Sequence, residues 1–177
     1  MTAERSPNRP SDRPFAADTG RLFAAAVLLF SAGALAVAYT AQWGFGLEPC
    51  PLCLWQRVPY GVAAVLALCA LAPRMEPWRP LILAVCGIAF ASGAAIAVYH
   101  FGVEQQWWRS AICAGGIPGP LTTAELLAAL NEPAPKPCDA VDWTVFGLSI
   151  TAYNAAVSAT LALFAVIGAW RVRHEGR

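Results

Sequence analysis

Two cysteines spaced as a Cys-x-x-Cys pair, Cys50 and Cys53, are the residues whose spacing most directly indicates chemistry. The pair follows one long apolar stretch and comes just before the next, so we expect it at the N-terminal end of a helix. The N–H groups and partial positive charge there stabilise a thiolate, chiefly on the second cysteine. Because a thiolate is both the nucleophile and the better leaving group in disulfide exchange, the pattern predicts reactive sulfur.

Arg57 lies four residues beyond Cys53, which puts both side chains on one face of the predicted helix. A guanidinium within reach would stabilise a Cys53 thiolate further. An arginine at the edge of a membrane span is costly and usually has either a function or an escape route. Two interpretations stay open: Arg57 serves the cysteine pair or an anionic oxygen nearby, or its side chain extends to the membrane surface.

A second pair of cysteines, Cys113 and Cys138, lies in a long connection between two apolar stretches. The proline-rich run 133–137 precedes Cys138, and flexible segments on both sides would let a bridge move between a partner and the first pair. A purely structural crosslink would not need such freedom. Two cysteines in each of two connections favour two bridges. Cys69 and Cys86 fall inside predicted spans, where cysteine packs as a small apolar residue.

The elements that must position these cysteines are membrane helices. The chain of 177 residues is 58% hydrophobic and 13% charged, which excludes an ordinary soluble domain. Crossing the hydrocarbon core takes about 20 apolar residues as a helix. We therefore predict an all-α membrane protein, a bundle of four transmembrane helices. Three of its expected spans follow stretches that lack charge, at about 22–43, 80–101 and 144–170. The second span reaches about 54–72 if the Arg57 side chain extends to the membrane surface.

The distribution of Arg and Lys predicts the orientation of this bundle. Nine of these residues lie on the side of the two termini and three on the other, so we expect both termini in the cytoplasm. The connections at about 44–53 and 102–143 would then face the periplasm. Residues 1–20 are rich in Pro, Ser and charge and are expected to form a disordered tail, before a single domain at 21–177. The net charge of +1 gives no reason to expect nucleic acid as a partner.

The second periplasmic connection contains the pattern of a short helix over 121–130. Thr122 and Glu125 have the spacing of a capping box, and Leu121 and Leu126 that of a hydrophobic staple. An apolar stripe on such a helix suits either the membrane surface or the protein itself, and we expect a short interfacial helix.

Three segments resemble the disulfide bond formation protein B (DsbB) family of membrane thiol oxidases. They are residues 48–57 (EPCPLCLWQR), residues 99–105 (YHFGVEQ), and Cys138-Asp139 followed by residues 143–149 (WTVFGLS). The resemblance covers roughly residues 21–170 and implies a multi-pass protein of the bacterial inner membrane. It departs from the family's pattern in the Gly/Pro-rich run 114–120, which bears on the docking of a partner rather than on the chemistry.

The resemblance also implies roles for the four outward cysteines. Cys113 and Cys138 would form a bridge that a reduced DsbA-like periplasmic oxidoreductase attacks, with the mixed disulfide at Cys113. Cys138 would then attack Cys50 and release Cys53, the thiolate that donates electrons to ubiquinone or menaquinone.

The same resemblance implies two residues at the quinone. Arg57 matches the quinone-side arginine of the family, and His100 lies near the outer end of the third span, where the family has a histidine near the quinone. Both are therefore candidate cofactor-binding residues.

Three other classes of protein are compatible with some of these features. A vitamin K epoxide reductase-like oxidase shares the four helices and paired cysteines, but its quinone-side pair follows the loop pair. A tetraspan protein with merely structural bridges does not explain a Cys-x-x-Cys pair above Arg57. Four thiolates suit zinc, but the second pair is 25 residues apart and lies in an oxidising compartment, so we expect no metal.

Overall fold

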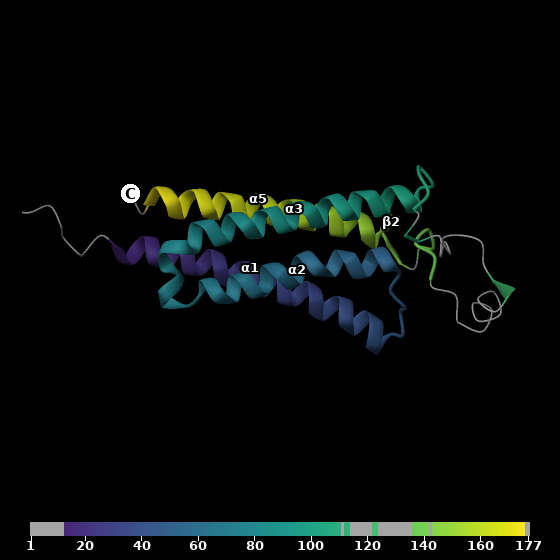
Figure 1. The fold of residues 1–177 in the computed structure, drawn as a ribbon, viewed down its shortest axis with the longest axis horizontal. Helices are drawn as coiled ribbons and strands as arrows, with labels where there is room; N and C mark the ends of the chain where they lie inside the picture. The colour runs from purple at the N-terminus through teal and green to yellow at the C-terminus, as the bar shows by residue number, and fades with distance from the viewer. Residues whose placement is uncertain (1–12, 111, 114–121, 124–135, 142, 176–177) are drawn as a thin grey trace, which may run out of the picture.

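The structure, a computed structural model, describes residues 13–110, 112–113, 122–123, 136–141 and 143–175. Its long helices are α1 (Arg13–Gly44), α2 (Pro51–Ala70), α3 (Arg79–Glu104) and α5 (Ile150–Glu175), and the 3-10 helix η2 (Pro73–Trp78) links α2 to α3. The long helices run side by side along the length of the molecule (Figure 1). Helix α3 packs most extensively against α5, and α2 packs against both α1 and α3.

Four helices of the described chain are long and apolar enough to cross a membrane, which confirms the predicted four-helix membrane bundle. Large apolar side chains cover its outside: Leu29, Val37 and Ile88 are all strongly exposed. Such an exterior suits lipid rather than water, because apolar side chains carry no free-energy penalty where they contact hydrocarbon.

Small residues let the helices of the bundle approach closely. A Cβ atom added at Gly87 of α3 would lie 2.8 Å from Val166 Cγ2 on α5, closer than real Cβ contacts allow. Further along α3, Gly93 packs against the ring of Pro59, which lies inside α2 without ending that helix. Close backbone approach through small residues is the usual way in which membrane helices pack.

Two helix ends differ from the predicted spans in ways that bear on the site. Helix α2 begins at Pro51 rather than near residue 54, because proline suits the first helical position, where its missing N–H has no partner anyway. Helix α3 continues to Glu104, beyond the predicted end at 101. At the other end of the bundle, α1 already begins at Arg13, within the segment 1–20 that we predicted as a tail.

The predicted start of the fourth span at residue 144 was wrong. Strand β1 (Thr144–Val145) pairs antiparallel with β2 (Leu148–Ser149), and α5 begins only at Ile150. Phe146 and Gly147 form the turn with positive φ values of 50° and 80°, the conformation that a tight hairpin of right-handed twist requires. The hairpin is as apolar as the helix that follows, so charge-free composition alone could not separate the two.

Most of the predicted interfacial helix lies outside the described residues, which include only 122–123 of that segment. The Gly/Pro-rich run 114–120 also lies outside them.

The two ends of the bundle differ in what they carry. The start of α1, η2 and the C-terminus lie at one end (Figure 1). The opposite end gathers the start of α2, the end of α3 and the hairpin before α5 (Figure 1). Cys50, Cys53, Cys113 and Cys138 all fall at this second end.

Candidate redox site

Cys50 caps the N-terminus of α2. Its backbone is extended (φ −70°, ψ 165°), Pro51 takes the first helical position, and the Cys53 N–H donates a hydrogen bond to Cys50 Sγ over 3.3 Å. The two sulfur atoms are 2.8 Å apart. A cap normally offers an oxygen to these N–H groups, so here the sulfur of Cys50 performs that role.

The electrostatics at this cap favour a thiolate on Cys50. The hydrogen bond with the Cys53 thiol is the main cause that lowers the pKa of Cys50 to about 4, against burial, which raises it. His100 and the Cys53 backbone N–H lower this pKa as well. The sequence predicts the thiolate chiefly on Cys53. Helix α2 begins at Pro51, about one turn earlier than expected, so its first N–H groups point at Cys50 instead.

Cys113 and Cys138 form a disulfide, with their Cα atoms 5.5 Å apart. Cys138 is only 2% exposed and packs with Cys50, Leu52 and Val103 in one buried apolar cluster, against which Cys53 and Cys113 also pack. The structure thus brings together the two cysteine pairs that the sequence places in separate connections. Among the described residues, the other free cysteines are Cys69, exposed on α2, and Cys86, buried in the bundle core.

His100 of α3 lies between the two pairs. Its imidazole is 2% exposed, and Nε2 is 3.6 Å from Cys50 Sγ and 3.2 Å from the main-chain oxygen of Cys138. On the other side of the ring, Nδ1 is 2.7 Å from Gln56 Nε2. One imidazole therefore contacts the sulfur of one pair and the backbone of the other.

A chain of buried polar side chains continues from His100 into the bundle. Asn154 Nδ2 donates to Gln56 Oε1, and the Tyr60 hydroxyl donates to Asn154 Oδ1 over 2.8 Å. The same Tyr60 oxygen is 2.8 Å from Ser158 Oγ. This series of hydrogen bonds joins residues of α2, α3 and α5. It holds the His100 side chain in position relative to Cys50.

The sequence reasoning missed most of this chain. Gln56, Asn154 and Ser158 were not singled out, although polar side chains inside predicted membrane spans are rare and usually mark a function. Tyr60, which belongs to the same series, is only 4% exposed within the core.

Arg57 lies on the other side of the cysteine pair, against α1. Its Nη1 donates to Gln42 Oε1, and its guanidinium carbon lies 4.9 Å from the centre of the Tyr39 ring. The Tyr39 ring in turn stacks on Trp43, with centroids 4.9 Å apart. Arg57 is held by these contacts one turn after Cys53, at an aromatic edge of the bundle.

A small cavity of about 30 Å³ opens beside the two sulfurs of the first pair. Cys50, Cys53, His100 and Glu104 line it, and Glu104 Oε2 is buried there with no hydrogen-bond partner in the described structure. Glu104 Oε1 accepts a hydrogen bond from the Thr151 hydroxyl over 2.6 Å. The ligand atoms of Cys50, Cys53 and His100 lie within 4.8 Å of one another, so these three residues have the geometry to hold a soft metal ion when both thiols are reduced.

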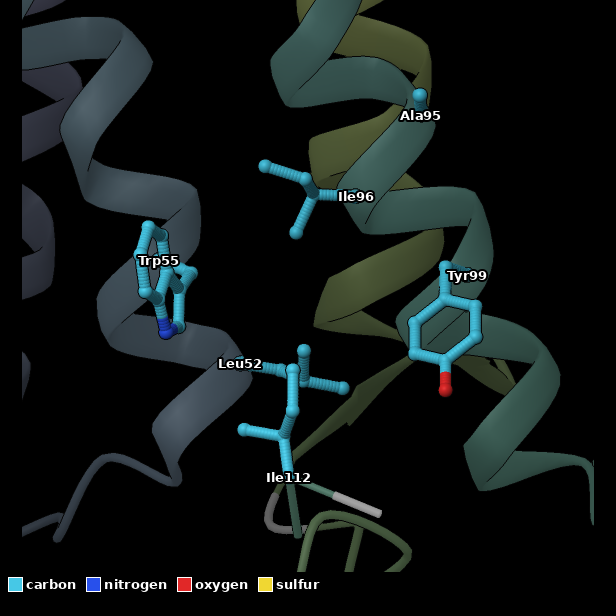
Figure 2. Close-up of a pocket in the computed structure, with 6 residues that line it drawn as sticks. All are labelled: Leu52, Trp55, Ala95, Ile96, Tyr99 and Ile112. Atoms are coloured by element: carbon cyan, nitrogen blue, oxygen red, sulfur yellow. The ribbon is translucent and has the colours of Figure 1, made fainter. Parts of the chain in front are cut away.

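A larger apolar groove of about 440 Å³ lies between α2 and α3. Figure 2 shows Leu52 and Trp55 on α2 across the gap from Ala95, Ile96 and Tyr99 on α3, with Ile112 at one end. Leu52 and Trp55 lie on the face of α2 opposite to Arg57, because they are offset from its face by about half a helical turn.

Four membrane-spanning helices with a dithiol and a disulfide packed together at one end define a multi-pass membrane thiol–disulfide oxidoreductase. The family comparison agrees: the family model described as "Disulfide bond formation protein DsbB" matches residues 20–168. The chain belongs to this disulfide bond formation protein family of the bacterial inner membrane.

Relatives of similar length support the same assignment. The chain is 33% identical over 141 residues to disulfide bond formation protein B of Methylobacillus flagellatus, covering 77% of this chain and 85% of the relative. It is 30% identical over 158 residues to the protein of the same name from Xanthomonas axonopodis pv. citri, covering 83% and 88%. No solved structure matches this chain.

Proposed function

We propose that this protein reoxidises a DsbA-like periplasmic oxidoreductase and passes the electrons through its two cysteine pairs to a membrane quinone. The single observation that carries the proposal is the packing of the Cys113–Cys138 disulfide against Cys50 and Cys53 in one buried cluster. Two pairs in contact can exchange disulfides without a large movement of the helices.

Electrons would enter at Cys113. A thiolate of the reduced partner attacks Cys113 Sγ, the Cys113–Cys138 bond breaks, and Cys138 leaves as a thiolate. The second thiol of the partner then attacks the mixed disulfide, which releases Cys113 and leaves the partner oxidised. Two electrons now reside on the loop pair.

The electrons would next move inward to the first pair. The Cys138 thiolate attacks Cys50 of an oxidised Cys50–Cys53 bridge and releases Cys53 as a thiolate. Cys113 then attacks Cys138, which reforms the loop disulfide and releases Cys50. The resulting state, a loop disulfide above a Cys50–Cys53 dithiol, is the arrangement of the described structure.

The residues around Arg57 fit a quinone. When bound, a quinone would accept the two electrons and two protons of the dithiol, which restores the Cys50–Cys53 bridge. Arg57 offers N–H donors one turn from Cys53, and Tyr39 and Trp43 supply flat aromatic surfaces at the same edge. Donors of this kind stabilise negative charge on an oxygen. Ubiquinone and menaquinone each carry a flat quinone ring with two carbonyl oxygens that such donors would bind.

We assign His100 primarily to the disulfide exchange between the two cysteine pairs. Its Nε2 contacts Cys50 Sγ, and its ring is buried between the two pairs, on the α3 side, whereas Arg57 is held on the α1 side. His100 and Arg57 would thus flank the Cys50–Cys53 pair, one at the exchange with Cys138 and the other at the quinone.

The experiment that tests this function measures quinone reduction by purified protein. A reduced DsbA-type partner and ubiquinone-1 are supplied anaerobically, and the loss of quinone absorbance is followed. Wild type and Cys69→Ser should turn over alike, whereas Cys113→Ser should retain an oxidised Cys50–Cys53 pair and reduce no quinone. A Cys113→Ser protein that oxidises the partner normally would contradict the proposed entry point.

A further inference from the structure

We propose that Gln56 and Asn154 are positioning residues that keep His100 neutral with its proton on Nε2, so that it donates a hydrogen bond to the sulfur of Cys50. The inference depends on the proposed function in one respect only, namely that Cys50 exchanges disulfides with Cys138. It concerns how the buried polar chain beyond His100 acts on that sulfur.

The direction of the hydrogen-bonded chain follows from its donors and acceptors. The Tyr60 hydroxyl donates to Asn154 Oδ1, which leaves Asn154 Nδ2 to donate to Gln56 Oε1. Only the amide nitrogen of Gln56 then remains to face His100 Nδ1, at 2.7 Å. An amide nitrogen donates and does not accept, so Nδ1 must carry the lone pair.

The other side of the imidazole requires the same arrangement. Nε2 lies 3.2 Å from the main-chain oxygen of Cys138, and a carbonyl oxygen can only accept. The proton of a neutral His100 therefore sits on Nε2. There it also points toward Cys50 Sγ at 3.6 Å, a distance at which a thiolate accepts from an N–H.

Burial makes this arrangement costly to change. Gln56, Tyr60, His100 and Ser158 are all buried, and a polar group buried without a partner is destabilising. A proton on Nδ1 would point at the N–H of the Gln56 amide, and two donors cannot form a hydrogen bond with each other. Turning the Gln56 amide to accept that proton would point its nitrogen at Asn154 Nδ2, so Asn154 and the Tyr60 hydroxyl would both have to turn with it. Each residue of the chain thus holds the next one in place.

Glu104 acts in the opposite direction and has to be weighed. Its Oε1 lies 4.0 Å from His100 Nε2, and a carboxylate near an imidazole favours the charged form. The Thr151 hydroxyl donates to the same Oε1, which satisfies part of that charge. A Cys50 thiolate, 3.6 Å from Nε2, favours the charged form as well. Direct contact of Gln56 with Nδ1, at 2.7 Å, is closer than either of these groups.

The consequence lies at Cys50. When Cys113 resolves the bond between Cys138 and Cys50, negative charge develops on Cys50 Sγ. A fixed N–H donor in a site that excludes water stabilises such charge more than water-exposed donors do. Gln56 and Asn154 touch neither sulfur, so they would act through His100.

Nitrogen NMR of His100 tests the inference directly. The chain contains two histidines, so labelling with ¹⁵N-histidine gives signals only from His100 and from His174 in the last turn of α5. The wild-type reduced protein at pH 7 should show His100 as the neutral tautomer protonated on Nε2. Gln56→Glu places a carboxylate against Nδ1 and should convert His100 to a form protonated on Nδ1. Asn154→Ala frees the Gln56 amide and should give mixed tautomers.

Thr160→Val is the matched control, because Thr160 lies on α5 with Asn154 but is exposed and bonds only to the Ala156 carbonyl among the described contacts. It should leave the His100 signal unchanged, and His174 should be unchanged in every variant. A wild-type His100 that is charged or protonated on Nδ1, or an unaltered His100 signal in Gln56→Glu, would overturn the inference.

A kinetic measurement separates this inference from the proposed function. Exchange between the two cysteine pairs should slow by up to about tenfold in Asn154→Ala, because part of its His100 lacks the Nε2–H donor and a lost hydrogen bond to a charged group has about this effect. The NMR result needs neither partner nor quinone. Absence of quinone reduction by the wild type would refute the proposed function and leave the tautomer of His100 as measured.

Discussion

The imidazole of His100 lies 3.6 Å from the sulfur of Cys50, although 50 residues separate them in the chain. The same Nε2 atom lies 3.2 Å from the main-chain oxygen of Cys138. One buried side chain therefore contacts both the cysteine pair at the start of α2 and the pair in the long connection between α3 and α5. This relationship makes exchange between the pairs the step at which His100 matters most.

Removal of the imidazole should slow exchange between the two pairs. We expect His100→Ala to reduce its rate roughly tenfold to a hundredfold, because a hydrogen bond to the developing Cys50 thiolate is lost. Stopped-flow mixing with reduced partner, followed by acid quench and mapping of disulfides, measures this rate. The first attack on Cys113 should keep its wild-type rate, and a variant that slows only that attack would contradict the role.

The reactivity of Cys50 should depend little on pH over a wide range. Its pKa is lowered to about 4 from an ordinary value of 9.0, so the thiolate persists as pH falls from 9 and is lost only near 4. The depressed pKa also stabilises the folded dithiol form above pH 9, and this contribution disappears progressively as pH falls toward 4. Alkylation of the reduced protein by iodoacetamide, read by mass spectrometry, should show a plateau across this range.

The Cys53→Ala variant provides the comparison for that titration. The hydrogen bond with the Cys53 thiol is the main cause of the low pKa of Cys50, and an alanine at position 53 removes that donor. His100→Ala removes a smaller cause, so its titration should move upward by less than that of Cys53→Ala. An alkylation rate for wild-type Cys50 that falls tenfold per pH unit below 9 would disprove the depressed pKa.

Arg57 should affect the quinone and not the cysteine exchange. Arg57→Met removes the charge and the N–H donors, and we expect a quinone KM raised about tenfold with a slower turnover. Arg57→Lys should fall between, since it keeps the charge but loses the planar fork. Steady-state quinone reduction at several quinone concentrations gives both constants.

The apolar groove between α2 and α3 offers a control for that experiment. Ala95 is exposed at its edge, so Ala95→Phe would fill the groove without crowding the core. If the quinone binds beside Arg57, this variant keeps the wild-type KM. A raised KM in Ala95→Phe together with a normal KM in Arg57→Met would move the quinone site to the groove of Figure 2.

The orientation of the bundle is also open to direct measurement. Nine Arg and Lys residues on the side of the termini against three on the other predict cytoplasmic termini and a periplasmic redox end. Reporter fusions after residue 177 and at residue 46 should therefore respond as cytoplasmic and periplasmic, respectively. Signals from the same side at both positions would refute the orientation.

Much of the fold could be predicted from the sequence because a membrane constrains composition. Charge is costly in the hydrocarbon region, so the middle of each of the four helices falls in a run with little or no charge. The hairpin at 144–149 escaped this argument, since a strand pair beside the membrane is equally free of charge. The turn residue Gly147, after two β-branched or aromatic neighbours, was the local signal for it.

The site was predictable in part for a different reason. Spacing placed Cys50 and Cys53 at a helix start, and Pro51 could have fixed that start one turn more accurately. The contact of His100 with Cys50 depends on how α3 packs against α2, which no local pattern encodes. Gln56 and Asn154 join through the same packing, and only their polarity inside apolar spans marked them.

Mapping of disulfides after a single turnover tests the central claim most directly. Fully oxidised, quinone-free protein is mixed with one equivalent of reduced partner, quenched with acid, alkylated, and analysed by mass spectrometry. We predict that the electrons come to rest on Cys50 and Cys53, while Cys113 and Cys138 are again joined, as in the structure. A final state with Cys113 and Cys138 reduced and the Cys50–Cys53 bridge intact would contradict inward transfer between the pairs.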